Sequence, residues 1–263
     1  MTEPLRIKFY ARSFDLRLYR LSRGLYEGLG YPTVRLTDQT ADGYFYTMLK
    51  DTDCDIAINV DEDAFITDPK AVMELVDYVV ENGYANAGCP DGGEGIPRCG
   101  DPSITNPFFN VFNLKLLREK FDRSQMTGQI DDCEPYYPFF RWMKDNFKIL
   151  YLTPEYHRDG FTTILKDSQG RTLCLHSWMA RFYSMPDFMV RHFQKDQGQQ
   201  KRRIDALIDE AYAIRSMQRP QFGLVDELSF FANKIVRWCI KIPQRISRWP
   251  YKLKRKILLS KRG

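Results

Sequence analysis

The chain has 263 residues, enough for one large domain or for one domain with a C-terminal extension. Its composition is 43% hydrophobic and 14% aromatic, which excludes a disordered, collagen-like or low-complexity protein. No apolar run is long enough to span a membrane, and the first residues lack the basic start and apolar stretch of a signal peptide, so we expect neither feature.

Positive charge is concentrated at the C-terminus. Residues 228–263 contain eleven Lys or Arg and no Asp or Glu, and without these charges the net +5 becomes −6 for residues 1–227. An acidic body with a basic tail does not fit a nucleic-acid groove, so we expect no nucleic-acid partner. The six cysteines lack metal-ligand spacing and the chain has no Asn-x-Ser/Thr site, which favours a cytoplasmic location over an oxidising compartment.

Over the first ninety residues, short apolar runs alternate with helical patterns, which is typical of a parallel α/β sheet. The clearest helix follows Asp68, which can cap it, and Pro69, which suits its first position; Gly83 ends it. We expect strands at residues 5–10, 32–36, 54–60 and 84–89, and helices at residues 18–30, 41–50 and 69–82.

The second part of the chain begins with a long irregular segment, residues 90–107, rich in glycine and proline. Loops of this length inside a domain are usually functional. A hairpin is expected around residues 167–170, and the chain is helical and increasingly basic from about residue 186. Between residues 107 and 186 we expect a strand end at 111–113, helices at 114–121 and 135–146, and strands at 147–152, 162–166 and 172–176.

The strongest candidate for chemistry is the acidic trio Asp61, Glu62 and Asp63, which directly follows an apolar strand. Ligands of open parallel sheets bind at the carboxyl ends of the strands, and two carboxylates two residues apart on extended backbone point the same way. Such a pair suits Mg²⁺ or Mn²⁺, which in turn would hold phosphate oxygens. The alternative is a solvated acidic loop that caps the next helix, although Asp68 already supplies that cap.

A strand that ends in Asp-x-Asp after an α/β half resembles the nucleotide-sugar-binding half of the GT-A glycosyltransferases. The resemblance covers about residues 5–183 and implies a GT-A-like mixed sheet flanked by helices, here with a C-terminal basic helical extension. It implies a hexosyltransferase that uses Mn²⁺ or Mg²⁺ to move a sugar from a nucleotide-diphosphate sugar to a saccharide or lipid-linked acceptor, in cell-surface polysaccharide or glycolipid synthesis. In that family, residues placed like Asp61 and Asp63 hold the metal and the diphosphate. Glu62 is a weaker candidate for nucleotide-sugar contact, because alternation turns it to the other face.

Two further segments lie where GT-A enzymes place functional residues. The end of the first strand, Tyr10, Ala11 and Arg12, would seat the nucleotide, because an aromatic ring can stack on a base and an arginine can bind phosphate. Two acids lie just ahead of the helix at 135–146. Asp132 is the first choice for the general base of an inverting reaction, and Glu134 is the second. The alternatives are ordinary surface-loop residues at the first place and acids favoured by the helix dipole at the second.

The late strand and the long loop supply the remaining candidates. His176 leaves an apolar strand, and in several GT-A families a late histidine is a further metal ligand; the alternative is a structural histidine. Arg181 would neutralise phosphate. Asn110 would bind the sugar and Phe108 would offer a stacking platform, with Asp101 and Glu94 as weaker candidates for sugar contacts and a plain solvated loop as the alternative.

Other functions remain open. A sugar nucleotidyltransferase is disfavoured, because no glycine-rich phosphate loop follows the first strand. A phosphohydrolase is weakened by Ala64, which stands where a hydroxyl residue would be expected. The third alternative is a non-enzymatic protein that binds membranes through its basic tail.

We expect three parts: a catalytic domain at 1–185, a helical extension at 186–223 and a basic amphipathic tail at 224–263. In the tail, Leu228, Phe231 and Ile235 recur at helical spacing, with basic residues beside them. Basic residues together with interfacial aromatics and too little apolar length to span are typical of a helix that lies on an anionic membrane. We therefore expect peripheral association with the inner face of a membrane; the alternative is an apolar face packed on the enzyme body.

Overall fold

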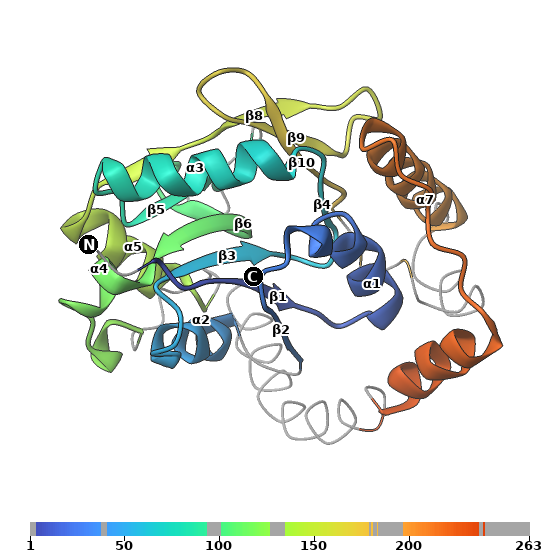
Figure 1. Ribbon diagram of the computed structural model, residues 1–263, viewed down its shortest axis with the longest axis horizontal. Coiled ribbons are helices and arrows are strands. Elements are labelled where there is room, and N and C mark those ends of the chain that lie inside the picture. The colour runs from blue at the N-terminus through green and yellow to red at the C-terminus, as the bar shows by residue number, and fades with distance from the viewer. Residues whose placement is uncertain are drawn as a thin grey trace, which may run out of the picture.

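Two β-sheets form the centre of the protein (Figure 1). The computed structural model describes residues 4–37, 41–93, 101–126, 135–178, 180, 183, 197–236 and 239. The larger sheet has six strands in the order β2-β1-β3-β6-β5-β7, and the smaller has four in the order β4-β10-β9-β8. The large sheet is mixed: β1, β2 and β3 are parallel, and β6 runs antiparallel between β3 and β5. Its strands are β1 (Ile7–Arg12), β2 (Thr33–Leu36), β3 (Ile56–Val60), β5 (Asn86–Pro90), β6 (Thr105–Asn113) and β7 (Ile149–Tyr151).

The small sheet is antiparallel throughout. Its first strand follows β3 after only three residues, so the chain passes from the large sheet to the small one at the acidic trio. Its other strands come from the second half of the chain, which brings the late hairpin to the end of β3. The strands are β4 (Ala64–Ile66), β8 (Thr153–Tyr156), β9 (Thr163–Lys166) and β10 (Thr172–His176).

Helices cover both faces of the large sheet (Figure 1). Side chains on one face of β3 pack with α3, and Ala57 on the other face packs with α2, α4 and α5. A third cluster joins α1 and α7 to β4 and β10, so α7 shares a core with the sheets. The helices are α1 (Leu16–Gly24), α2 (Ala41–Lys50), α3 (Pro69–Glu81), α4 (Leu114–Arg118), α5 (Tyr137–Asn146) and α7 (Gln197–Ile214), with 3-10 turns η1 (Glu27–Leu29) and η2 (Arg123–Met126).

The structure confirms the expected mixed sheet flanked by helices. It also confirms the details of α3: the Asp68 side chain accepts a 2.9 Å hydrogen bond from the Ala71 N–H, and Gly83 follows with φ of +64°. Residues 224–236 are helical, and beyond them only Cys239 of the basic tail is among the described residues. None of the described helices is long and apolar enough to cross a membrane.

One expectation is wrong in its bounds. The irregular segment expected at residues 90–107 ends before Thr105, where β6 begins, and this strand is buried over almost all of its length. Polar residues such as Asn110 interrupt the apolar pattern of β6. Asn110 faces Asn59 of β3, and the side-chain amides of both bond to carbonyls inside the protein. The short strands β4 and β8 were also not expected from the sequence.

Candidate functional site

The acidic trio forms a tight turn rather than extended backbone. The Asp61 N–H still bonds to the Phe108 carbonyl of β6, but the Ala64 N–H bonds back to the Asp61 carbonyl at 3.0 Å. Asp63 is then fixed from the other sheet, because its carbonyl accepts a 3.0 Å bond from the Ser177 N–H. The expectation of extended backbone at Asp61–Asp63 is therefore wrong, and the alternation from which a shared direction was expected does not apply in a turn.

Asp63 and His176 meet at this turn. His176 lies opposite Ala64 in the pairing of β10 with β4, and its Nε2 lies 3.5 Å from Asp63 Oδ1. The expected closeness of these two side chains is confirmed, while their role as metal ligands stays a prediction. Burial raises the pKa of Asp63, but the His176 imidazole, a backbone hydrogen bond and the charge of Arg12 together hold the pKa of that carboxyl below its usual range.

Aromatic rings fix the orientation of His176. Its imidazole stacks on Phe108 with centroids 4.0 Å apart and planes 4° apart, and Trp178 packs edge-on at 4.4 Å. Phe108 is therefore a buried support for His176 and not an exposed platform for a sugar. The Nδ1 atom of His176 is also buried and has no hydrogen-bond partner among the described residues.

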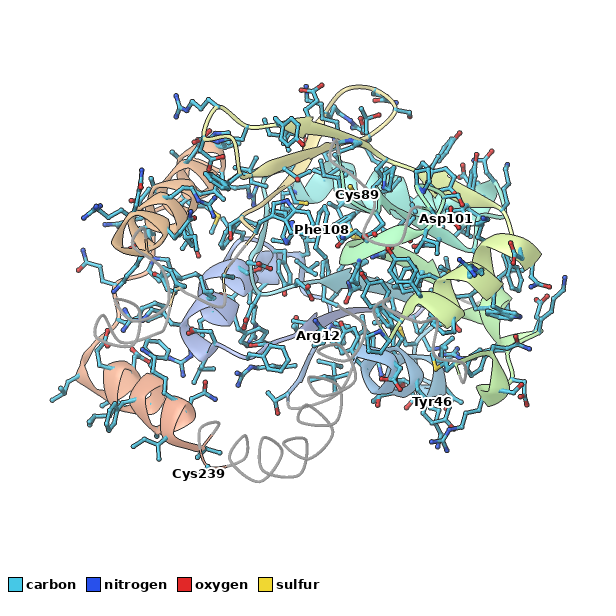
Figure 2. All side chains as sticks on the ribbon, turned by 180° about the vertical axis from the view of Figure 1, so that it is seen from behind. Arg12, Tyr46, Cys89, Asp101, Phe108 and Cys239 are labelled. Atoms are coloured by element: carbon cyan, nitrogen blue, oxygen red, sulfur yellow. The ribbon has the colours of Figure 1, made fainter. Side chains whose placement is uncertain are left out.

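Asp61 and Arg12 lie beside this pair. The negative charge of Asp61 contributes, after burial, to the raised pKa of Tyr44 on α2, and Arg12 acts in the opposite direction. The guanidinium of Arg12 is close enough to act on both Tyr44 and Asp63. Arg12 and Phe108, labelled in Figure 2, come from β1 and β6, the two strands that flank β3.

Glu62 has a different task from the one expected. Its buried Oε2 accepts bonds from the Ser13 hydroxyl at 3.0 Å and from the backbone N–H groups of Phe14 and Asp15. Burial, with the nearby Asp15 carboxylate, raises the pKa of Glu62 to about 8. Glu62 therefore ties the loop after β1 to the turn after β3, and its carboxylate does not face a nucleotide sugar.

Three other predicted contacts are also wrong, because the side chains are buried. The Tyr10 ring belongs to the core under α2 and its hydroxyl donates to Asp51, so it cannot stack on a base. Ala11 is equally buried. Asn110 Nδ2 donates to the Asn106 carbonyl at 2.8 Å, inside the sheet.

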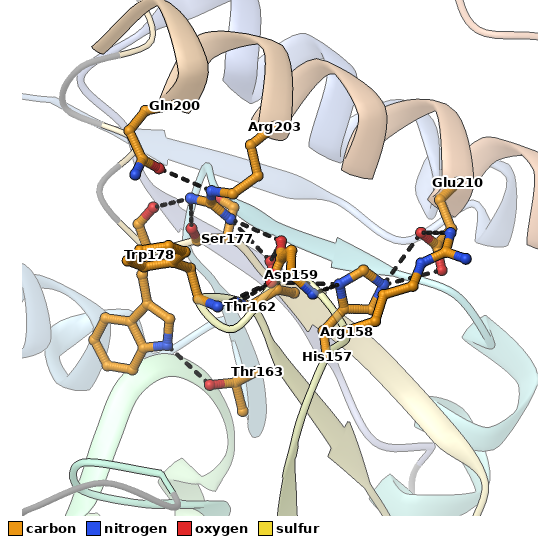
Figure 3. Close-up of polar contacts among 11 residues, drawn as sticks. His157, Arg158, Asp159, Thr162, Thr163, Ser177, Trp178, Gln200, Arg203 and Glu210 are labelled. Atoms are coloured by element: carbon orange, nitrogen blue, oxygen red, sulfur yellow. Dashed lines mark hydrogen bonds and ion pairs between the residues drawn. The ribbon is translucent and has the colours of Figure 1, made fainter. Parts of the chain in front are cut away.

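A positioning residue that the sequence did not reveal is Arg203 of α7 (Figure 3). Its guanidinium donates to the carbonyls of Ser177 and Trp178, the latter at 2.9 Å, and pairs with Asp159 at 3.1 Å. Trp178 has φ of +39°, which a side chain other than glycine rarely adopts, and its indole N–H donates to Thr163 Oγ1 at 2.8 Å. Arg203 thus holds the segment that follows His176. An arginine on a helix has no sequence pattern that would have indicated this role.

The proposed general bases Asp132 and Glu134 lie outside the described residues, as do Arg181 and Glu94. Asp101, a weaker candidate, accepts bonds from the Ser103 N–H at 3.0 Å and from Lys144, which is a loop-forming arrangement. The structure adds a buried carboxylate that the sequence did not indicate, Asp91 just after β5. It accepts bonds from Asn106 Nδ2 at 2.9 Å and from the Tyr137 hydroxyl at the start of α5.

The described residues contain no group of three or more His, Cys, Asp or Glu side chains placed to hold a metal ion. Of the three predicted ligands, the structure brings Asp63 and His176 together. A carboxylate oxygen and an imidazole nitrogen are nonetheless suitable partners for Mn²⁺ or Mg²⁺. These ions often take one or two protein ligands and complete their coordination with phosphate and water.

No model of a known protein family matches the chain, and no curated protein sequence matches it. Solved structures do resemble it. They include A197 from STIV, with 14% identity over 64% of this chain and 93% of that one and a TM-score of 0.41. The mannosyltransferase PcManGT from Pyrobaculum calidifontis, solved with GDP-Man and Mn²⁺, has 10% identity over 58% of this chain and 56% of its own, with a TM-score of 0.40. A glycosyltransferase involved in glycosylation of the major capsid of PBCV-1 has 11% identity over 57% and 83%, with a TM-score of 0.41.

Proposed function

We propose that this protein is a metal-dependent glycosyltransferase that moves a sugar from a nucleotide-diphosphate sugar to the hydroxyl of a saccharide or lipid-linked acceptor. The bond between the anomeric carbon and the diphosphate oxygen breaks, and the anomeric carbon bonds to the acceptor oxygen. The products are a glycoside, a nucleoside diphosphate and a proton.

One observation carries this proposal: Asp63 and His176 meet where the chain leaves the carboxyl end of β3, with Arg12 at the end of the parallel neighbour β1. Open α/β sheets bind their ligands at this edge. The Arg12 guanidinium offers two parallel N–H donors, which match the oxygens of a phosphate. The arrangement therefore combines a cation-binding pair with a phosphate-binding side chain.

Two of the three predicted ligands, Asp63 and His176, lie close enough together to hold one divalent cation. Asp63 and His176 would hold the ion, and the contacts of His176 with Phe108 and Trp178 keep its imidazole in place. A bound cation would offset negative charge on the diphosphate as it leaves. Asp61, whose charge also acts on Tyr44, is proposed as the third ligand of the ion.

The acceptor side is assigned to the region ahead of α5. Asp132 or Glu134 would take the proton of the acceptor hydroxyl if the reaction inverts configuration. Arg181, which follows β10 in sequence, would add positive charge near the diphosphate.

The experiment is a panel of UDP-, GDP-, ADP- and dTDP-sugars added to the full chain with Mn²⁺ or with EDTA. We expect one donor to raise the melting temperature only with Mn²⁺ and to release nucleoside diphosphate. Selective stabilisation by nucleoside triphosphates, with release of pyrophosphate, would instead indicate a sugar nucleotidyltransferase. The absence of any nucleotide effect would leave the non-enzymatic alternative.

A further inference from the structure

The helix of residues 224–236 exposes an apolar stripe. Leu224, Leu228, Phe231 and Ile235 are between 46% and 76% exposed. Their spacing of four, three and four residues places them on one side of the helix. We call these four residues the 224–235 stripe.

The opposite side of this helix is the one that is attached to the protein. Asp226 and Glu227 form ion pairs with Arg20 and Arg17 of α1. Phe230 is buried between Phe222 and Arg17, whose guanidinium lies 4.7 Å from its ring centroid. A surface helix ordinarily turns its apolar side inward and its charges outward. Here the acidic residues face the protein and the stripe faces away from it.

The helix lies at the periphery, away from both sheets, in Figures 1 and 2. Its inner side is held by α1, whose first N–H, that of Leu16, lies 3.3 Å from Asn233 Oδ1. The attachment is therefore specific, and it fixes which side of the helix is presented outward.

The positive charge of the sequence within and after this helix indicates which kind of partner the stripe binds. Lys234 lies within the helix, and residues 237–263 contain ten further Lys or Arg, no Asp or Glu, and the aromatic residues Trp238, Trp249 and Tyr251. An apolar stripe alone would also suit a protein partner. Combined with a basic segment free of negative charge and with aromatic residues of the kind found at membrane interfaces, it suits an anionic lipid surface.

We propose that the 224–235 stripe inserts into the headgroup layer of an anionic membrane, with the basic residues against the lipid phosphates. The stripe enters below the phosphates and α1 remains on the aqueous side. This docking is independent of the proposed transfer reaction, because none of its residues belongs to the candidate site.

The test is co-sedimentation of the full chain with vesicles of phosphatidylcholine alone or mixed with phosphatidylglycerol. We expect pelleting with the mixed vesicles only, and its loss at high salt. The triple variant Leu228→Ser, Phe231→Ser, Ile235→Ser should bind at least about tenfold more weakly, because it removes most of the apolar area that enters the lipid.

The matched control removes three exposed apolar side chains elsewhere: Tyr78→Ser, Tyr156→Ser, Ile214→Ser, which are 43%, 57% and 53% exposed. It should pellet like the wild type. Equal pelleting of the stripe variant and the wild type would overturn the proposal, and so would a wild type that does not pellet. If the wild type instead forms a dimer that only the stripe variant dissociates, the stripe is a contact between two copies and the proposal is wrong.

Discussion

The Arg203 guanidinium donates a 2.9 Å hydrogen bond to the carbonyl of Trp178, two residues beyond His176 (Figure 3). This bond joins α7 to the strand end that positions the imidazole, and it holds Trp178 in a backbone conformation that costs about 1–3 kcal/mol. A helix from the C-terminal third of the chain thus supports the candidate site.

Arg203→Lys should lower the free energy of unfolding by about 1–3 kcal/mol, because an ammonium cannot replace the planar set of N–H donors. It should also weaken Mn²⁺-dependent nucleotide binding at temperatures where the variant is folded, since His176 loses its support. Arg158→Lys, which changes an exposed side chain of the same network, should have neither effect. Denaturant unfolding and nucleotide titration measure the two effects, and an Arg203 variant with wild-type binding would remove its positioning role.

Glu62→Gln should alter how stability depends on pH. Because burial raises the pKa of Glu62 from 4.5 to about 8, the folded state holds a proton that the unfolded state has lost. The wild type should therefore lose stability as pH rises from about 4.5 to about 8 through this group. Glutamine cannot ionise, and its amide oxygen can accept from the same donors.

The measurement is the melting temperature of both proteins from pH 5 to pH 9 in EDTA. The variant should gain on the wild type as pH rises through this window, whereas Glu81→Gln, at an exposed position, should follow the wild type. Parallel curves for Glu62→Gln and the wild type would show that the Glu62 carboxyl ionises normally.

Gly88→Ala should destabilise the protein by about 1–3 kcal/mol through overpacking. A Cβ atom at Gly88 would clash with Asn110 Oδ1 and lie 3.1 Å from Thr105 Cβ, both buried in β6. Gly28→Ala is the matched control, because its Cβ would meet no atom within 4 Å. Equal chemical-denaturation midpoints for the two variants would contradict the packing of Asn110 over Gly88.

For an inverting reaction, Asp132→Asn or Glu134→Gln should lower turnover by about two or more orders of magnitude. Donor binding should change little, because the general base acts on the acceptor hydroxyl. Asp122→Asn, at a fully exposed carboxyl ahead of η2, is the control. Single-turnover assays at saturating donor separate the two effects, and wild-type turnover in both amide variants would remove these acids from the mechanism.

The sequence was most informative where local chemistry decides the structure. Asp68 and Pro69 start α3, and the hairpin of β9 and β10 forms around Asp167 and Gly170 as expected. The apolar run of β3 and the acidic residues after it indicated the edge of the sheet where the candidate site lies. The closeness of His176 to Asp63 also followed from the expectation that this late strand closes the site.

What the sequence could not predict depends on tertiary contacts. The turn from Asp61 to Ala64 exists because the chain leaves one sheet for another, and alternation along a single strand carries no sign of that change. Tyr10 and Asn110 have polar groups that resemble those of binding residues, but the Tyr10 hydroxyl donates to Asp51 and Asn110 Nδ2 donates to the Asn106 carbonyl inside the protein. Burial of polar side chains with partners distant in sequence is not visible in a local pattern.

The most direct test of the central claim is calorimetric titration of UDP and GDP into the full chain, with Mn²⁺ and with EDTA, for the wild type, Asp63→Asn and Asp53→Asn. Asp53 is an exposed carboxylate remote from the site and serves as the control. We expect the wild type and Asp53→Asn to bind one of the two nucleotides at least about tenfold more tightly with Mn²⁺, because the ion links the protein to the diphosphate. Asp63→Asn should lose this manganese dependence while keeping the wild-type fold. Unchanged manganese dependence in Asp63→Asn would contradict the assignment of the site.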